Sequence, residues 1–141
     1  MAEAPIPFQI KSIATRQFAT MESAYKEGDE AEFTSTFNFG VGKEDHLVVT
    51  LLDVSFSFNG SPFIILKIKM DFDVQPEAFD RFKSKDGAIV VPKAFLTHLA
   101  AMSISTARGI LHAELKGTEF NHVVLPVLNV SEVLQEDVRF E

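Results

Sequence analysis

The residues whose chemistry could serve a metal site are the four histidines, His46, His98, His112 and His122. His98 and His112 are fourteen residues apart, so on one helix they would share a face but lie about 21 Å from each other. That separation excludes a shared metal ion, and the chain contains no His-Glu-x-x-His motif or other ligand spacing. We therefore interpret the histidines as ordinary surface or boundary residues.

One pair of carboxylates could support acid–base chemistry. Asp71 and Asp73 alternate on one face of a predicted strand, about 7 Å apart. Two carboxyl groups at such a separation can act as general acid and general base. Lys67 and Lys69 precede them on the same face, and this pattern favours a solvated, charged surface instead.

Nucleophilic catalysis has no candidate residue in this chain. The absence of cysteine excludes disulfides, thiolate metal sites and a cysteine nucleophile. The Gly-x-Ser-x-Gly signature of a serine hydrolase is also absent. The sequence therefore predicts no catalytic residue, no metal and no cofactor, and a protein that binds other molecules rather than an enzyme.

The length and net charge of the chain limit its domain number and its partners. The 141 residues suit one domain spanning 1–141. A net charge of −7 repels phosphates, so nucleic acid and anionic membranes are unfavourable partners. No apolar run approaches the roughly 20 residues that span a bilayer, and Glu3 stands where a signal peptide would be basic. We expect a cytoplasmic protein without membrane insertion.

Phenylalanine is unusually frequent, with 14 Phe beside one Tyr and no Trp. A phenyl ring has no polar group, so it serves packing or apolar contact. The sequence leaves two interpretations open for these side chains: a phenylalanine-rich core, or an exposed apolar surface that binds a partner.

Alternation of apolar and polar residues predicts four strands, at 8–20, 31–41, 46–58 and 63–74. The apolar phase of the first strand shifts between Ile10 and Ile13, which indicates a β-bulge. Asn59-Gly60 predicts a tight hairpin between the third and fourth strands. Residues 75–87 are interpreted as a polar connection.

A long helix is predicted from about Pro92 to Lys116, with Gly117 just beyond its end. Ser131 suits the cap of a short last helix at about 132–135. Strands followed by helices predict an α+β fold: a four-stranded antiparallel sheet, a long helix and a short C-terminal helix. Because one helix cannot cover four strands, we also expect self-association.

Several segments, in this order, resemble the SecB family of export chaperones. Phe8–Ile13 reads Phe-Gln-Ile-Lys-Ser-Ile and is similar to that family's opening strand. Ala107-Arg108 and then Lys-Gly-Thr at 116–118 resemble its Ala-Arg and Arg-Gly-Thr, with one residue fewer between them. Leu-Pro-Val-Leu-Asn at 125–129 is similar to its Pro-Val-Asn link. The resemblance spans about residues 8–134.

The resemblance implies an ATP-independent holdase that binds unfolded polypeptide clients during preprotein export. Members of the family are homotetramers, built as dimers of dimers, and their second strand offers alternate apolar side chains to the client. The matching positions here are Phe33, Phe37 and Phe39, with Ser35 as a departure from the apolar pattern. Whether these phenylalanines form a groove or a core stays open at this point.

Two alternatives concern the system in which such a chaperone would work, and a third is a different function. The family docks the SecA motor through acidic residues, but Gln17 and Met21 stand at two of those positions. Related SecB-like chaperones instead serve toxin–antitoxin systems. The other function is a protein that binds a small hydrophobic ligand between the helix and the sheet.

Overall fold

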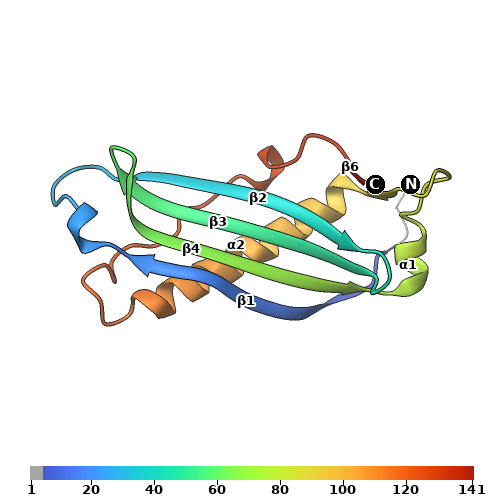
Figure 1. Ribbon diagram of the computed structural model, residues 1–141, viewed down its shortest axis with the longest axis horizontal. Helices are drawn as coiled ribbons and strands as arrows, with labels where there is room; N and C mark the ends of the chain where they lie inside the picture. The colour runs from blue at the N-terminus through green and yellow to red at the C-terminus, as the bar shows by residue number, and fades with distance from the viewer. Residues whose placement is uncertain (1–4) are drawn as a thin grey trace.

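The fold is α+β, and the computed structural model describes residues 5–141 (Figure 1). Four long antiparallel strands form one sheet in the order β1-β4-β3-β2. Their bounds are Phe8–Thr20 (β1), Glu32–Gly42 (β2), Leu47–Phe58 (β3) and Ser61–Val74 (β4). Each strand begins and ends within two residues of its predicted range, so the four-stranded sheet predicted from alternation is confirmed.

Two local irregularities of the sheet also follow the prediction. The pairing of β1 with β4 shifts register between Ile10 and Ser12, and again between Thr15 and Gln17. The first shift is the bulge indicated by the change of apolar phase. In the hairpin between β3 and β4, Asn59 and Gly60 have φ angles of 50° and 82°. Positive φ at both central residues is what a tight type I′ hairpin requires.

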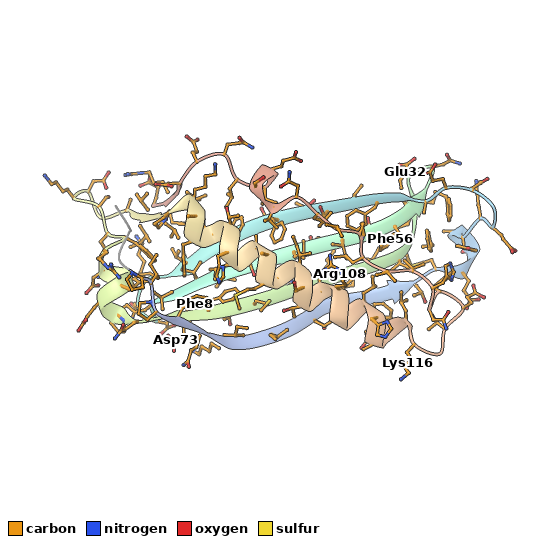
Figure 2. All side chains as sticks on the ribbon, turned by 180° about the vertical axis from the view of Figure 1, so that it is seen from behind. Phe8, Glu32, Phe56, Asp73, Arg108 and Lys116 are labelled. Carbon is orange, nitrogen blue, oxygen red and sulfur yellow. The ribbon has the colours of Figure 1, made fainter. Side chains whose placement is uncertain are left out.

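The long helix α2, Lys93–Leu115, packs on one face of the sheet and contacts the two central strands, β3 and β4. Figure 2 shows that α2 crosses the sheet obliquely. Gly117 follows the helix with a φ of 85°, the left-handed conformation expected just past a helix end. The side chains at this interface are almost fully buried, among them Leu52, Leu66, Ile68, Met70, Leu96, Leu99 and Leu111.

A hydrogen-bond chain sets the position of α2 on β3. Ser103 donates its hydroxyl proton to the carbonyl of Leu99 at 2.9 Å, and Thr50 Oγ1 lies 2.7 Å from Ser103 Oγ. Because Ser103 has only one proton, Thr50 is the donor in the second bond. Both side chains are buried, so each satisfies a group that water cannot reach.

Removing one of the two hydroxyl groups is expected to lower the free energy of unfolding more than removing both. Thr50→Val should lower the free energy of unfolding by about 1–2 kcal/mol, since Ser103 Oγ then lacks its buried donor. The double variant Thr50→Val with Ser103→Ala should recover most of that loss, because no unpaired group remains. Urea denaturation of the wild type, both single variants and the double variant measures the coupling, and strictly additive losses would contradict the assignment.

The connection between β4 and α2 is more ordered than the sequence indicated. Within the predicted polar connection at 75–87, Pro76–Asp80 forms a short helix, α1, and a short strand, β5, follows it at Ile89–Val91. Phe79 and Phe82 are buried, and their rings lie 5.7 Å apart between centroids. This packing closes one end of the core.

The C-terminal segment corrects one prediction. In place of the short helix expected at 132–135 there is a single 3-10 turn, η2, at Val130–Glu132, followed by a strand, β6, at Val138–Phe140. The carboxamide of Asn129, and not Ser131, caps the turn by accepting from the Ser131 backbone N–H at 3.2 Å. Three residues cannot form a stable helix alone, so the tertiary contacts decide this segment.

The end of the chain is fastened beside the start of α2. Strand β6 pairs antiparallel with β5, and Asp137 Oδ1 accepts a 2.7 Å hydrogen bond from the backbone N–H of Lys93. Pro92, at the helix N-cap, has no side-chain acceptor, so Asp137 supplies it. Hydrogen bonds from Ser84 and then Arg139 lower the pKa of Asp86 to about 2, so its ion pair with Arg139 persists further into the acid range than that of an ordinary aspartate.

None of the helices formed by residues 5–141 combines the length and the apolar character needed to cross a membrane.

Candidate binding groove

The three phenylalanines singled out on β2 lie on the helix side of the sheet. Phe33 pairs with Phe56 and Phe37 with Leu52, residues of β3 that are buried on that side. Phe33, Phe37 and Phe39 are nevertheless only half-buried. The reason is that β2 is an edge strand, and α2 lies over β3 and β4. They belong neither to the sealed core nor to the fully exposed surface.

Two hollows open along this uncovered flank, both between β2 and the chain that follows α2. The Phe33 hollow has a volume of about 310 Å³ and is lined by Tyr25, Asp29, Ala31, Phe33, Phe56, Phe58, Phe63, His122, Val123 and Val124. The Phe37 hollow has a volume of about 460 Å³ and is lined by Ser35, Thr36, Phe37, Leu128, Asn129, Glu132 and Val133. We call the two together the groove. Phe39 lines neither hollow, but its ring stacks on Phe37 at 5.8 Å.

The floor of the Phe33 hollow is an aromatic cluster that strand alternation did not identify as part of a site. Phe63 is its centre, with ring centroids 4.9 Å from Phe58, 5.2 Å from Tyr25 and 5.4 Å from Phe120. Phe33 joins through Phe56 at 5.1 Å. These rings come from five separate segments of the chain, so no local pattern could have grouped them. The high Phe content was the one signal available.

The opposite wall of the groove is the link, residues 119–129, which turns at 119–122 and then runs without helix or strand structure over 123–129. Leu125 is buried at 2% exposure, while its neighbours Val124 and Val127 are 61% and 93% exposed. The link therefore places one apolar side chain into the core. It turns two others outward, of which Val124 lines the Phe33 hollow.

Arg108 of α2 fixes the middle of the link. Its Nε donates to the carbonyl of Leu125 at 3.2 Å, and its Nη2 donates to the carbonyl of Pro126 at 3.0 Å. Figure 2 shows Arg108 on the side of α2 that faces this segment. Residues 122–124 line one hollow, and residues 128, 129, 132 and 133 line the other. Arg108 therefore holds the wall at the point between them.

Replacing Arg108 by methionine keeps the packing of the aliphatic stem and removes both donors. We expect the free energy of unfolding to fall by about 1–2 kcal/mol, because two link carbonyls lose a charged partner. The backbone amides of residues 123–125 and 127–128 should exchange hydrogen faster. Arg108→Lys can reach one carbonyl and should show an intermediate effect in hydrogen exchange read by mass spectrometry. Unchanged exchange in the methionine variant would contradict the assigned role.

Each hollow of the groove has one carboxylate in its lining. Asp29 lines the Phe33 hollow and Glu132 lines the Phe37 hollow. Among the residues of the described chain that line the two hollows, none is Lys or Arg. The site can therefore bury apolar side chains on aromatic rings and attract cationic groups at its rim.

The candidates for chemistry lie away from this groove, except for His122 in the lining of the Phe33 hollow. Asp71 accepts from Ser12 Oγ at 2.8 Å and faces Lys69 Nζ at 3.7 Å, on the opposite face of the sheet. His46 packs on Phe79, and His98 packs on Phe8. Within residues 5–141, no group of three or more His, Asp or Glu side chains is placed to hold a metal ion.

Gln17 and Met21, which the sequence resemblance aligns with two acidic positions of the SecB family, lie near the end of β1. Gln17 pairs with Lys67 of β4. Met21 is half-buried and donates its backbone N–H to the carbonyl of Phe63 at 2.8 Å. Around them the outer face mixes both signs of charge, as in the 3.2 Å ion pair between Arg16 and Asp53.

No model of a known protein family matches this chain, and no curated protein matches it.

Proposed function

We propose that this protein is an ATP-independent holdase of the cytoplasm that binds unfolded polypeptides in the groove, in the manner of SecB. The observation that carries the proposal is the half-buried state of Phe33 and Phe37, which line open hollows on a flank that α2 leaves uncovered. An unfolded client has apolar side chains in water, and these hollows offer them an aromatic surface.

The energetics of such binding need no catalytic group and no nucleotide. Each Å² of apolar surface removed from water contributes roughly 25 cal/mol, before the cost of ordering the client. Phenyl rings accept many side chains because they impose no hydrogen-bond pattern. An aromatic groove therefore favours promiscuous binding, which is what a holdase requires.

We include self-association in the proposal, as a tetramer or a dimer. Ile10 and Ile13 on the edge strand β1 are 41% and 50% exposed. The outward face of α2 presents small side chains at Ala101, Ser105 and Gly109. A second copy could cover either surface, and size-exclusion chromatography with light scattering measures the assembly.

We do not extend the proposal to the SecA motor. Docking through a negative surface requires an excess of acids on the outer sheet face, but Lys67 lies opposite Gln17 and Lys69 lies beside Asp71. The partner that receives the client is therefore left to experiment, and a toxin–antitoxin partnership is an equal candidate.

Light scattering of a chemically unfolded client diluted into buffer without ATP tests the proposed function. The protein should suppress aggregation in a dose-dependent way, saturating near one assembly per client. An acidic protein of similar size and charge serves as the control, since net charge alone also slows aggregation. Aggregation equal to that with the control protein would refute the holdase proposal.

A further inference from the structure

The short strand β5 is completed by the last residues of the chain, 137–141, which we call the tail. Val138 of the tail pairs with Val91, and Phe140 pairs with Ile89. Ile89 and Val91 are buried, whereas the two tail side chains are half-buried and pack on the margin of the core. Figure 1 shows β6 at the same end of the molecule as α1. The tail therefore covers β5 from outside.

The edge of β5 that the tail covers is formed without the tail. Val90 donates its backbone N–H to the carbonyl of Phe82 at 2.7 Å, on the side of β5 opposite to β6. Because hydrogen-bonding directions alternate along an antiparallel strand, the backbone groups of Ile89 and Val91 point toward the tail. An open strand edge of this kind can bind an extended peptide as an added strand.

Two polar contacts determine which side chains suit this edge. Asp137 Oδ1 accepts a 2.7 Å hydrogen bond from the backbone N–H of Lys93, in the first turn of α2. The helix has no side-chain cap from its own N-cap residue, Pro92. Arg139 forms an ion pair with Asp86. The polar contacts alternate with the apolar ones, so the tail presents an acid, an apolar residue, an arginine and an apolar residue in that order.

The contacts that hold the tail are few and exposed. Strand β6 has three residues, and so short a strand pair is not stable alone. The side chains of Arg139 and Asp86 are 44% and 58% exposed, and an ion pair so exposed contributes little. Leu134 is buried just before the tail, which keeps the tail at a high local concentration. Proximity therefore holds the tail as much as affinity does, and a peptide of the same pattern can displace it.

We propose that β5 and the first turn of α2 form a peptide-binding site for an extended segment of the form acid–apolar–Arg–apolar. The tail is a displaceable internal occupant of this site, and a partner protein that carries such a segment would exchange with it. The residues that line the two hollows of the groove are different ones, so the inference does not depend on the holdase function.

Fluorescence anisotropy with a labelled peptide of residues 135–141 tests the site on the whole chain. The wild type should bind this peptide weakly, because its own tail competes. The tail-weakened variant, Asp137→Ala with Phe140→Ser, should bind it about tenfold more tightly, as expected if the wild-type tail fills the site about nine-tenths of the time. A scrambled peptide of the same composition controls for charge and hydrophobicity and should not bind.

A variant of the site then tests the recognition of arginine. In the tail-weakened chain, a peptide with Arg139→Gln should bind about two- to fivefold more weakly than the unchanged peptide. Adding Asp86→Asn to the chain should abolish this difference, because the carboxylate that selects the arginine is gone. Asparagine keeps an acceptor oxygen for the backbone N–H of Ala88, so a general loss of binding by both peptides is not expected and would contradict the assigned role of Asp86.

Three results would overturn the proposal. The first is equal affinity of the peptide for the wild type and for a folded tail-weakened chain, and the second is equal binding of the scrambled peptide. The third is a dimer in native mass spectrometry that the peptide dissociates, because the occupant would then be the tail of a second copy.

One measurement needs no variant and decides the matter if the tail-weakened chain is unfolded by circular dichroism. Hydrogen exchange of residues 138–140 in the wild type should become faster when the peptide is in excess, because the displaced tail loses its pairing with β5. Exchange that stays unchanged while the peptide is bound would show that the peptide binds elsewhere.

Discussion

Replacing Phe33 and Phe37 together by serine is expected to weaken the binding of an unfolded client by about 100-fold or more, while the protein stays folded. Burial of one large apolar side chain is worth about 1.5–3 kcal/mol, and each 1.4 kcal/mol is a factor of ten in affinity. Both rings line a hollow that the client would fill. Isothermal titration with a soluble unfolded client measures the loss.

The cost of this change to stability should be smaller than that of a core substitution. Removing a buried phenylalanine costs about 3–5 kcal/mol, and these rings are half-buried. We therefore expect a loss of about 2 kcal/mol at each position. Domains of this kind have about 5–15 kcal/mol in total, so most molecules should remain folded.

Phe39 provides a matched control for the double variant. It lies on the same face of the same strand and is also half-buried, but it lines neither hollow. Phe39→Ser should cost similar stability and leave most of the client affinity. If Phe39→Ser weakens binding as much as Phe37→Ser, or if the double variant unfolds, then these residues act as core and the groove is wrongly placed.

Phe63→Ala is expected to cause the largest loss of stability of any single substitution considered, about 3–5 kcal/mol. Phe63 is 1% exposed, and its ring contacts those of Tyr25, Phe58 and Phe120. The alanine would leave a cavity that three rigid rings cannot collapse to fill. Urea denaturation measures the change in the free energy of unfolding.

Two further variants serve as controls for this expectation. Phe63→Leu preserves most of the volume and should cost less than half as much. Ile13→Ala, at a position that is 50% exposed on β1, should cost well under 1 kcal/mol. A loss below about 1 kcal/mol for Phe63→Ala would show that the cluster is not a packed floor, and the Phe33 hollow would lose its base.

Much of the fold could be predicted because its signals are local. Alternation with period two assigned β3 and β4 to within two residues and identified their buried face. Asn59-Gly60 and Gly117 marked a turn and a helix end, because each requires a positive φ that few residues adopt. These features depend on neighbours a few residues away and on no distant contact.

The short elements could not be predicted, because distant contacts stabilise them. Strand β6 has three residues and exists by pairing with β5, which lies almost fifty residues earlier. The turn η2 stands in place of the expected C-terminal helix, and Asn129 caps it by accepting from the amide of Ser131. In such short segments propensity is weak, and tertiary partners decide the conformation.

The site was found in part from sequence. Phe33 and Phe37 were named because of the resemblance to SecB and the alternation of β2, and the structure places each beside a hollow. The aromatic floor and the role of Arg108 were not found. Tyr25, Phe63 and Phe120 meet only after folding, and nothing in the sequence shows which carbonyls a helical arginine will reach.

The sequence by itself determined a sheet with one apolar face and a single long helix to cover it. Only the tertiary structure decided which part of that face stays open. A helix with its side chains is about 10–12 Å wide, and neighbouring strands lie about 4.8 Å apart, so α2 can cover two of the four strands. It covers β3 and β4, and the phenylalanines of the edge strand β2 are left beside the link, where a groove remains.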